Sequence, residues 1–318
     1  MLAPWLELPV VAESIARASD AAGLDLVRHG TTSDAETIRD TAVAQPLLVA
    51  AALASARAVL DLDAVAPLAP ATAPLLGATA GHSVGELAAA TLAGVLGDRD
   101  AMHLVGVRGS AMARAAAATP TGMCAVLGGD AQDVLAALAA HELVPANVNG
   151  GGQVVAAGTL EALAAFSAAP PARARVVPLQ VAGAFHTVHM APAVAELEAA
   201  AAGVTADDPV VPLLTNSDGT VLTSGTEALT RLVAQVARPV RWDLCQETLL
   251  ALGVTGLLEL APGGVLAGLA RRTLRGVEAV AVTTPADLDA ARDLVQRHGT
   301  PATPTATAAP TAQQGDPS

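Results

Sequence analysis

The chain has 318 residues, of which 52% are hydrophobic, 1% aromatic and 15% charged, and its formal net charge is −13 at pH 7. This negative balance argues against nucleic acid or an anionic membrane as the main partner, because both bind basic surfaces. The composition fits a small-molecule substrate better. The length allows one large domain, or a large domain with a smaller one inserted into it. Because aromatic residues are so scarce, the core must be built mainly from Ala, Val and Leu. Lysine and tyrosine are absent from the sequence.

Helical periodicity and short apolar runs alternate along the chain, which predicts an α/β fold. In residues 1–119 the pattern gives a helix (AVAQPLLVAAALASARAVL), a strand (GATAGHS) and a second helix (VGELAAATLAGVL). Residues 120–181 follow the order strand, helix, strand, strand, helix, strand, which is the βαββαβ order of a ferredoxin-like unit. Residues 182–296 return to α/β. We therefore expect a large subdomain formed by 1–119 and 182–296, with a small subdomain inserted at 120–181.

The last segment, 297–318, is rich in Pro, Thr and Ala and has no apolar period, which predicts a disordered tail. The two cysteines, Cys124 and Cys245, lie far apart without metal-ligand spacing, which indicates reduced thiols. The N-terminal MLAPWLELPVV lacks the basic region of a signal peptide, and no stretch approaches ~20 uninterrupted apolar residues. These features predict a cytoplasmic protein that does not span a membrane.

A Gly-x-Ser-x-Gly pattern in GHSVGE is typical of a nucleophile elbow, a tight strand-to-helix turn that presents a serine hydroxyl. Ser83 is therefore the candidate nucleophile, and it needs a base. His186 directly follows a predicted strand in GAFHTVHM, where an α/β sheet collects its site, while His189 is the weaker alternative and His82 is interpreted as packing. No acidic residue lies near His186 in the sequence, so a backbone carbonyl could orient the base instead.

Arg108, in HLVGVRGSAM, stands in a helix that otherwise reads as apolar. One interpretation is an arginine at a helix end with a solvated head. The other is a clamp on a substrate carboxylate, because the planar guanidinium matches two oxygens. The sequence pattern leaves both open.

Six motifs stand in the same order and nearly the same spacing as in the malonyl-CoA:acyl carrier protein transacylases: GHSVGE, the Arg-Gly of VRGSAM, TGMCAVLGG, ANVNGGGQVVAAG, VAGAFHT and ARPVRW. The chain resembles this family from about Leu2 to roughly Leu294. The resemblance implies an α/β-hydrolase-like large subdomain with a parallel sheet and an inserted ferredoxin-like subdomain, in agreement with the order above. It also implies transfer of a malonyl group from malonyl-CoA to the phosphopantetheine thiol of acyl carrier protein, for fatty-acid or polyketide synthesis.

The same resemblance implies roles for particular residues. Ser83 would be the nucleophile, His186 the base and Arg108 the ligand of the malonyl carboxylate, with the main-chain carbonyl of Gln235 orienting the base. Phe185 would leave little room for an α-methyl group on the acyl chain. The N–H of Val84 would be one of two oxyanion donors.

The second oxyanion donor of the family lies in an N-terminal Gly-Gln-Gly loop that follows a strand, and this chain starts after the corresponding segment. We therefore expect Met1 to be an internal methionine of the natural protein and the chain as written to be nearly inactive. The missing loop leaves one alternative open, a truncated, non-catalytic protein that binds malonyl groups or carrier protein. The elbow leaves a second one open, a serine hydrolase or thioesterase. The hydrolase would need an acidic residue between Ser83 and its histidine and an HGGG-like loop, for which Arg28-His29-Gly30 is the one faint candidate.

The resemblance implies a monomer with no metal or redox cofactor. An acidic carrier protein would have to meet a local basic patch on this acidic chain. The densest one lies in LARRTLRG, at Arg271, Arg272 and Arg275, and Arg241 is a possible addition.

Overall fold

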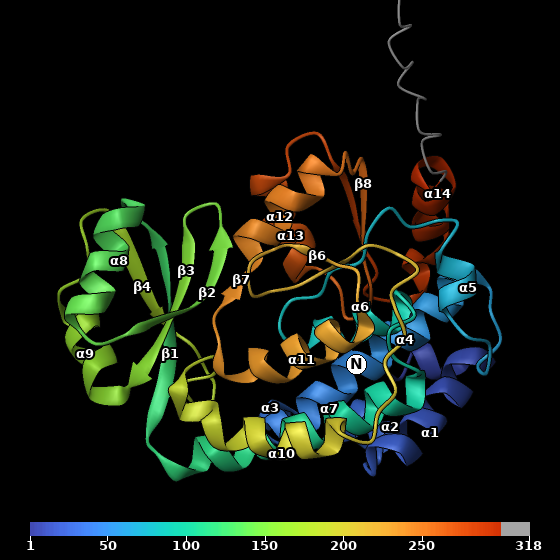
Figure 1. Ribbon diagram of the computed structural model, residues 1–318, viewed down its shortest axis with the longest axis horizontal. Helices are drawn as coiled ribbons and strands as arrows, with labels where there is room; N and C mark the ends of the chain where they lie inside the picture. The colour runs from blue at the N-terminus through green and yellow to red at the C-terminus, as the bar shows by residue number, and fades with distance from the viewer. Residues whose placement is uncertain (300–318) are drawn as a thin grey trace, which may run out of the picture.

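The computed structural model describes residues 1–299, which form two parts of unequal size (Figure 1). The smaller part, at the left of the figure, contains the predicted βαββαβ order: β1 (Thr121–Gly128), α8 (Ala131–Ala140), β2 (Val144–Gly150), β3 (Gln153–Thr159), α9 (Leu160–Ala168) and β4 (Ala174–Pro178). Its strands lie side by side in the order β4-β1-β3-β2, and all three of these pairs are antiparallel. The expectation of a ferredoxin-like unit is confirmed.

Local sequence explains the helices of this unit. Asp130 accepts hydrogen bonds from two N–H groups at the start of α8, and Thr159 does the same once for α9, so each helix begins at a side-chain cap. Both helices cover one face of the sheet, where Val126, Leu138 and Phe166 are buried together. The small subdomain therefore has an apolar core of its own.

A fifth strand joins this sheet from the larger part. β7 (Val240–Arg241) pairs in parallel with β2, with Asn147 opposite Val240 and Val148 opposite Arg241. The two parts of the molecule thus share one sheet.

The larger part is mostly helical. Its helices are α1 (Pro9–Ala22), α2 (Leu26–Thr31), α3 (Ala35–Arg39), α4 (Thr41–Leu60), α5 (Ala69–Thr72), α6 (Gly85–Leu92), α7 (Asp98–Ala118), α10 (Ala191–Ala201), α11 (Gly225–Ala234), α12 (Trp242–Ala251), α13 (Val265–Thr273) and α14 (Leu288–His298). Short 3-10 turns are η1 (Trp5–Glu7), η2 (Val188–Met190), η3 (Gln235–Ala237) and η4 (Pro285–Asp287). The remaining strands are β5 (Leu213–Leu214), β6 (Val221–Leu222), β8 (Gly256–Glu259) and β9 (Glu278–Ala281).

Helix α4 lies at the centre of this part, in contact with α1, α6 and α7. It is long and apolar enough to cross a membrane, yet 78% of its most apolar window is buried inside the protein. It is therefore the core helix of the fold. Small side chains, mainly Ala, allow its neighbours to approach closely.

The parallel sheet of the larger part is short. Within residues 1–299 it consists of the β8–β9 pair and a single parallel bridge between Thr79 and Leu213. The strand expected over GATAGHS is therefore reduced to Thr79. Pro212 lies next to the bridge and has no N–H to donate, which limits how far the ladder extends.

The chain end also differs from expectation. Helix α14 continues to His298, so it includes two residues of the range 297–318 in which a disordered tail was predicted. The rest of that prediction, 300–318, lies outside the described residues.

Candidate active site

Ser83 lies at the turn between the Thr79 bridge and α6, with φ of +53°. A non-glycine residue in this left-handed region is uncommon and strained, which is typical of a nucleophile elbow. The turn is tight because a Cβ atom at Gly81 would lie 2.0 Å from the carbonyl carbon of Gly85, so only glycine fits there. The sequence pattern therefore has a steric cause.

His186 meets Ser83 across the site. Its Nε2 lies 2.8 Å from Ser83 Oγ, although the two residues are 103 positions apart. The histidine sits in the loop after β4 with φ of +61°, and the loop passes close to α7 because Gly183 has no side chain to strike Ala116. His189, the weaker candidate, makes no hydrogen bond to Ser83 in the described part of the chain.

The other nitrogen of His186 faces a backbone carbonyl. Nδ1 lies 3.1 Å from the carbonyl oxygen of Gln235, in the position where a serine hydrolase would have a carboxylate. The Gln235 side-chain Nε2 also lies 3.2 Å from Nδ1. The shorter contact with the carbonyl favours the tautomer with the proton on Nδ1, which leaves Nε2 free to accept the Ser83 proton. Burial and the nearby Arg108 cation lower the pKa of His186 to about 3. The imidazole is therefore neutral at pH 7, as a general base must be.

Arg108 lies in the middle of α7 and is 3% exposed, so the interpretation as a solvated helix end is wrong. One guanidinium nitrogen, Nη2, donates to Ser83 Oγ at 3.1 Å and to Gln235 Oε1 at 3.2 Å, while Nη1 donates to Gln45 Oε1. Burial lowers its pKa to about 10, so it remains a cation at neutral pH. A buried cation thus lies beside the candidate nucleophile.

Three polar residues near the site were missed at the sequence level: Gln45, Glu86 and Asn216. All three are buried, Gln45 on α4, Glu86 on α6 and Asn216 after β5. Burial raises the pKa of Glu86 to about 8, so its carboxyl is mainly neutral at pH 7. Gln45 could have been identified as a polar residue within an apolar helix. Glu86 could have been identified as the glutamate that ends the GHSVGE motif.

Val84 begins the turn into α6, and within residues 1–299 its N–H has no hydrogen-bond partner. An unpaired N–H at a helix N-terminus can stabilise negative charge. Phe185 is half-buried between apolar side chains of the two subdomains. A small cavity of about 10 Å³ adjoins Ser83, Glu86 and Arg108, with room for about one water molecule, and Phe185 does not line it.

His82 packs against the ring of Trp242 in an edge-on contact, and its Nε2 lies 2.9 Å from Asn149 Oδ1 of the small subdomain. This environment agrees with the interpretation as packing. The Arg28-His29-Gly30 segment forms part of α2, where His29 contacts Ser33. It does not form a loop of the HGGG type.

Both cysteines are free and buried, Cys124 in β1 and Cys245 in α12. Among residues 1–299 there is no group of three or more His, Cys, Asp or Glu side chains placed to hold a metal ion.

Residues 8–284 match the model of a family described as acyl transferase domain. A malonyl CoA-acyl carrier protein transacylase of Mycobacterium bovis is 52% identical over 289 residues, which cover 91% of this chain and 93% of that protein. The namesake in Escherichia coli is 35% identical, covering 90% and 92% of the two chains.

Solved structures give the same result. The crystal structure of MCAT from Mycobacterium tuberculosis matches with a TM-score of 0.84 and 51% identity, covering 92% of this chain and 94% of that one. A type II PKS acyl-carrier protein in complex with its malonyl-transacylase matches with a TM-score of 0.81 and 33% identity, at the same 92% and 94% coverage.

Proposed function

The chain belongs to the family of malonyl CoA-acyl carrier protein transacylases, and we propose that it transfers the malonyl group of malonyl-CoA to the phosphopantetheine thiol of an acyl carrier protein. One observation carries the proposal: the candidate nucleophile Ser83 contacts a neutral histidine at 2.8 Å and a buried arginine cation at 3.1 Å. The first contact serves acyl transfer. The second serves recognition of an acyl group that carries its own carboxylate.

In the first half-reaction, Ser83 Oγ attacks the thioester carbonyl while His186 Nε2 takes the hydroxyl proton. The tetrahedral intermediate then collapses, its carbon–sulfur bond breaks, and His186 returns the proton to the departing coenzyme A thiolate. A malonyl ester of Ser83 remains. The carbonyl of Gln235 stabilises the imidazolium that forms between these steps, because it accepts from Nδ1–H.

The Val84 N–H is proposed as a donor to the oxyanion. Ser83's own N–H is unsuited to this role, because it already donates to Asn216 Oδ1 at 2.7 Å. The unpaired N–H one residue further on lies at the start of α6, where the helix dipole adds to the attraction.

Arg108 is proposed to bind the malonyl carboxylate. Its donors are held by Gln45, Gln235 and Ser83. These neutral acceptors orient the guanidinium, and a carboxylate replaces a neutral acceptor favourably because charge-assisted bonds are stronger. An acetyl group offers no such partner. Phe185 is proposed to restrict α-branched acyl groups.

In the second half-reaction, the carrier-protein thiol gives its proton to His186, attacks the ester carbonyl, and Ser83 leaves with that proton. We propose that the carrier protein docks at Arg271, Arg272 and Arg275. All three are exposed at or just after the end of α13, and none forms an ion pair within the described residues. Arg241 is excluded from this patch as a free charge, since it pairs with Asp243 at 2.8 Å.

Serine, histidine and arginine side chains supply all the chemistry, so we propose that no cofactor is required. All of them come from one chain, which supports a monomer. Two buried free thiols support a cytoplasmic location. The product would serve fatty-acid or polyketide synthesis.

The test is to mix the protein with malonyl-CoA and analyse its peptides by mass spectrometry. We expect a malonyl adduct on the peptide that contains GHSVGE, and its loss when acyl carrier protein with a free phosphopantetheine thiol is added. The Ser83→Ala variant should form no adduct. An adduct that survives in this variant, or one that water removes as fast as carrier protein does, contradicts the proposal.

A further inference from the structure

Asn216 contacts both sides of the nucleophile elbow through one side chain. Its Oδ1 accepts from the Ser83 N–H at 2.7 Å, and its Nδ2 donates to the Gly81 carbonyl at 2.7 Å. The residue is fully buried. A carboxamide carries an acceptor and a donor at its end, which neither an ionised carboxylate nor an apolar side chain of this size provides.

Glu86 holds this asparagine from the other direction. Its Oε1 accepts from the Asn216 backbone N–H at 2.7 Å. Glu86 belongs to α6, the helix that begins two residues after Ser83. The elbow, the asparagine and the first turn of α6 therefore close a ring of hydrogen bonds around the Ser83 backbone.

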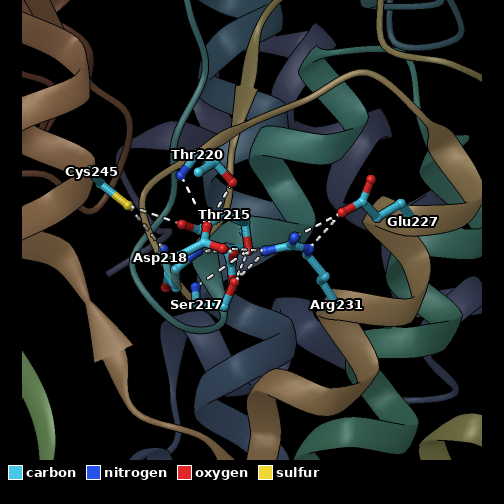
Figure 2. Close-up of polar contacts among 9 residues, drawn as sticks. Thr215, Ser217, Asp218, Thr220, Glu227, Arg231 and Cys245 are labelled. Carbon is cyan, nitrogen blue, oxygen red and sulfur yellow. Dashed lines mark hydrogen bonds and ion pairs between the residues drawn. The ribbon is translucent and has the colours of Figure 1, made fainter. Parts of the chain in front are cut away.

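The turn that carries the asparagine is itself fixed by its flanking residues (Figure 2). Arg231, from α11, donates to Ser217 Oγ at 2.7 Å and to Asp218 Oδ2 at 2.8 Å. From α12, Cys245 Sγ donates to the Thr215 carbonyl at 3.3 Å. Helices on two sides thus hold the residues before and after the asparagine, so the carboxamide is presented in one orientation.

We propose that Asn216 is a positioning residue for the acyl-transfer reaction, and that Glu86 holds it in place. The φ of +53° at Ser83 is a strained conformation that persists only when surrounding contacts determine it. Asn216 supplies contacts on both sides of that residue and so keeps Oγ within reach of His186 Nε2. The inference rests on the proposed role of Ser83 as nucleophile.

The experiment compares Asn216→Ala with the unchanged protein. We expect kcat for malonyl transfer to fall about 10²-fold, since small displacements of a reacting group have effects of this size. KM for malonyl-CoA should not change, because Asn216 does not contact Arg108. Labelling of Ser83 by a fluorophosphonate, which carries no malonyl group, should slow by a similar factor.

Two sets of control variants keep the test decisive. Ser55→Ala removes a buried hydrogen bond that α4 accepts from the Ala261 N–H, away from the elbow, so it should lower thermal stability and leave kcat and labelling unchanged. Glu86→Gln keeps an acceptor for the Asn216 N–H and should retain kcat, whereas Glu86→Leu removes it and should lower kcat. If Asn216→Ala does not fold, the Gln and Leu variants at position 86 decide the question.

The inference is overturned if Asn216→Ala keeps the unchanged protein's labelling rate, or if Ser55→Ala or Glu86→Gln loses as much kcat as Asn216→Ala. A separate result would remove the proposed function instead. Failure of the unchanged protein to form a malonyl adduct refutes that function, while fluorophosphonate labelling still measures whether Asn216 positions the serine.

Discussion

His186 takes its orientation from the main-chain carbonyl of Gln235, which lies 3.1 Å from Nδ1. A neutral carbonyl fixes the ring and its tautomer without adding a negative charge. Such a partner raises the pKa of the imidazole less than a carboxylate does, and the buried setting lowers it to about 3. The base therefore stays neutral far into the acidic range.

This relationship predicts the pH dependence of the reaction. Since the folded pKa of His186 lies well below the ordinary 6.5, kcat/KM should remain level as the pH falls from about 8 to about 5.5. Initial rates of malonyl transfer, measured in buffers of equal ionic strength, would check this. A decline centred near pH 6.5 would show that the base titrates as an ordinary histidine.

Arg108 is predicted to determine selectivity for malonyl over acetyl groups. Hydrogen bonds to a charged group contribute about 1.5–3 kcal/mol, so Arg108→Ala should reduce the malonyl-to-acetyl preference by about tenfold to 10²-fold. Competition between malonyl-CoA and acetyl-CoA measures the ratio directly. Arg108→Lys keeps the charge but not the planar guanidinium, so its malonyl-to-acetyl preference should lie between those of the unchanged protein and Arg108→Ala. Equal preference in all three proteins would remove the carboxylate-binding role.

Glu86 predicts a dependence of stability on pH. Its folded pKa of about 8 lies above its ordinary 4.5, so between these values the folded protein binds more protons than the unfolded chain does. Stability from this group is complete below pH 4.5 and is lost as the pH rises toward 8. Glutamine cannot ionise, so the Tm of Glu86→Gln should exceed that of the unchanged protein by a growing margin as the pH increases.

His186 acts in the opposite direction, between its folded pKa of about 3 and 6.5, but it is present in both proteins and cancels in the difference. Thermal unfolding of the two proteins at about pH 5 and about pH 8 is sufficient. A constant Tm difference would mean that Glu86 is ionised in the folded protein throughout.

The basic patch on α13 predicts a separation of the two half-reactions. Arg271→Glu with Arg272→Glu should slow transfer to carrier protein and leave malonylation of Ser83 from malonyl-CoA intact, because exposed charges act mainly on association rate. A double variant of Arg28 and Arg39 to Glu changes the net charge equally on α2 and α3, which lie far from α13 in Figure 1. If both double variants lose the same fraction of the rate of transfer to carrier protein, the loss is due to the net charge and not to the patch on α13.

Sequence reasoning succeeded where local signals suffice. The order of strands and helices in 120–181 follows from short-range periodicity, and that subdomain has the predicted βαββαβ order along the chain. The glycines of GHSVGE pointed to Ser83, and the structure brings His186 within 2.8 Å of it. The expectation that His186 directly follows a strand is wrong, because β4 ends at Pro178, eight residues earlier, and a loop carries the histidine.

The sequence could not predict positions that depend on contacts between segments far apart in the chain. Asn216 sits in a turn-forming sequence, TNSDG, in which a solvent-exposed asparagine is the usual expectation, and only the elbow's approach buries it. Likewise, Thr79 forms a single bridge instead of a full strand, because Pro212 has no N–H to continue the ladder on one side and the Asn216 N–H is taken by Glu86 on the other. The position of Arg108 within α7 could not be assigned by pattern either, since burial of its head depends on Gln45 of another helix.

The shared sheet has a mechanical consequence. β7 begins five residues after Gln235, and it pairs the large subdomain with β2 of the small one. A rotation of the small subdomain would therefore displace the short segment between Gln235 and β7, and with it the Gln235 carbonyl that orients His186. The same rotation would also strain the His82–Asn149 contact beside the nucleophile. Such a rotation of the small subdomain would thus displace groups that contact both the base and the turn of the serine.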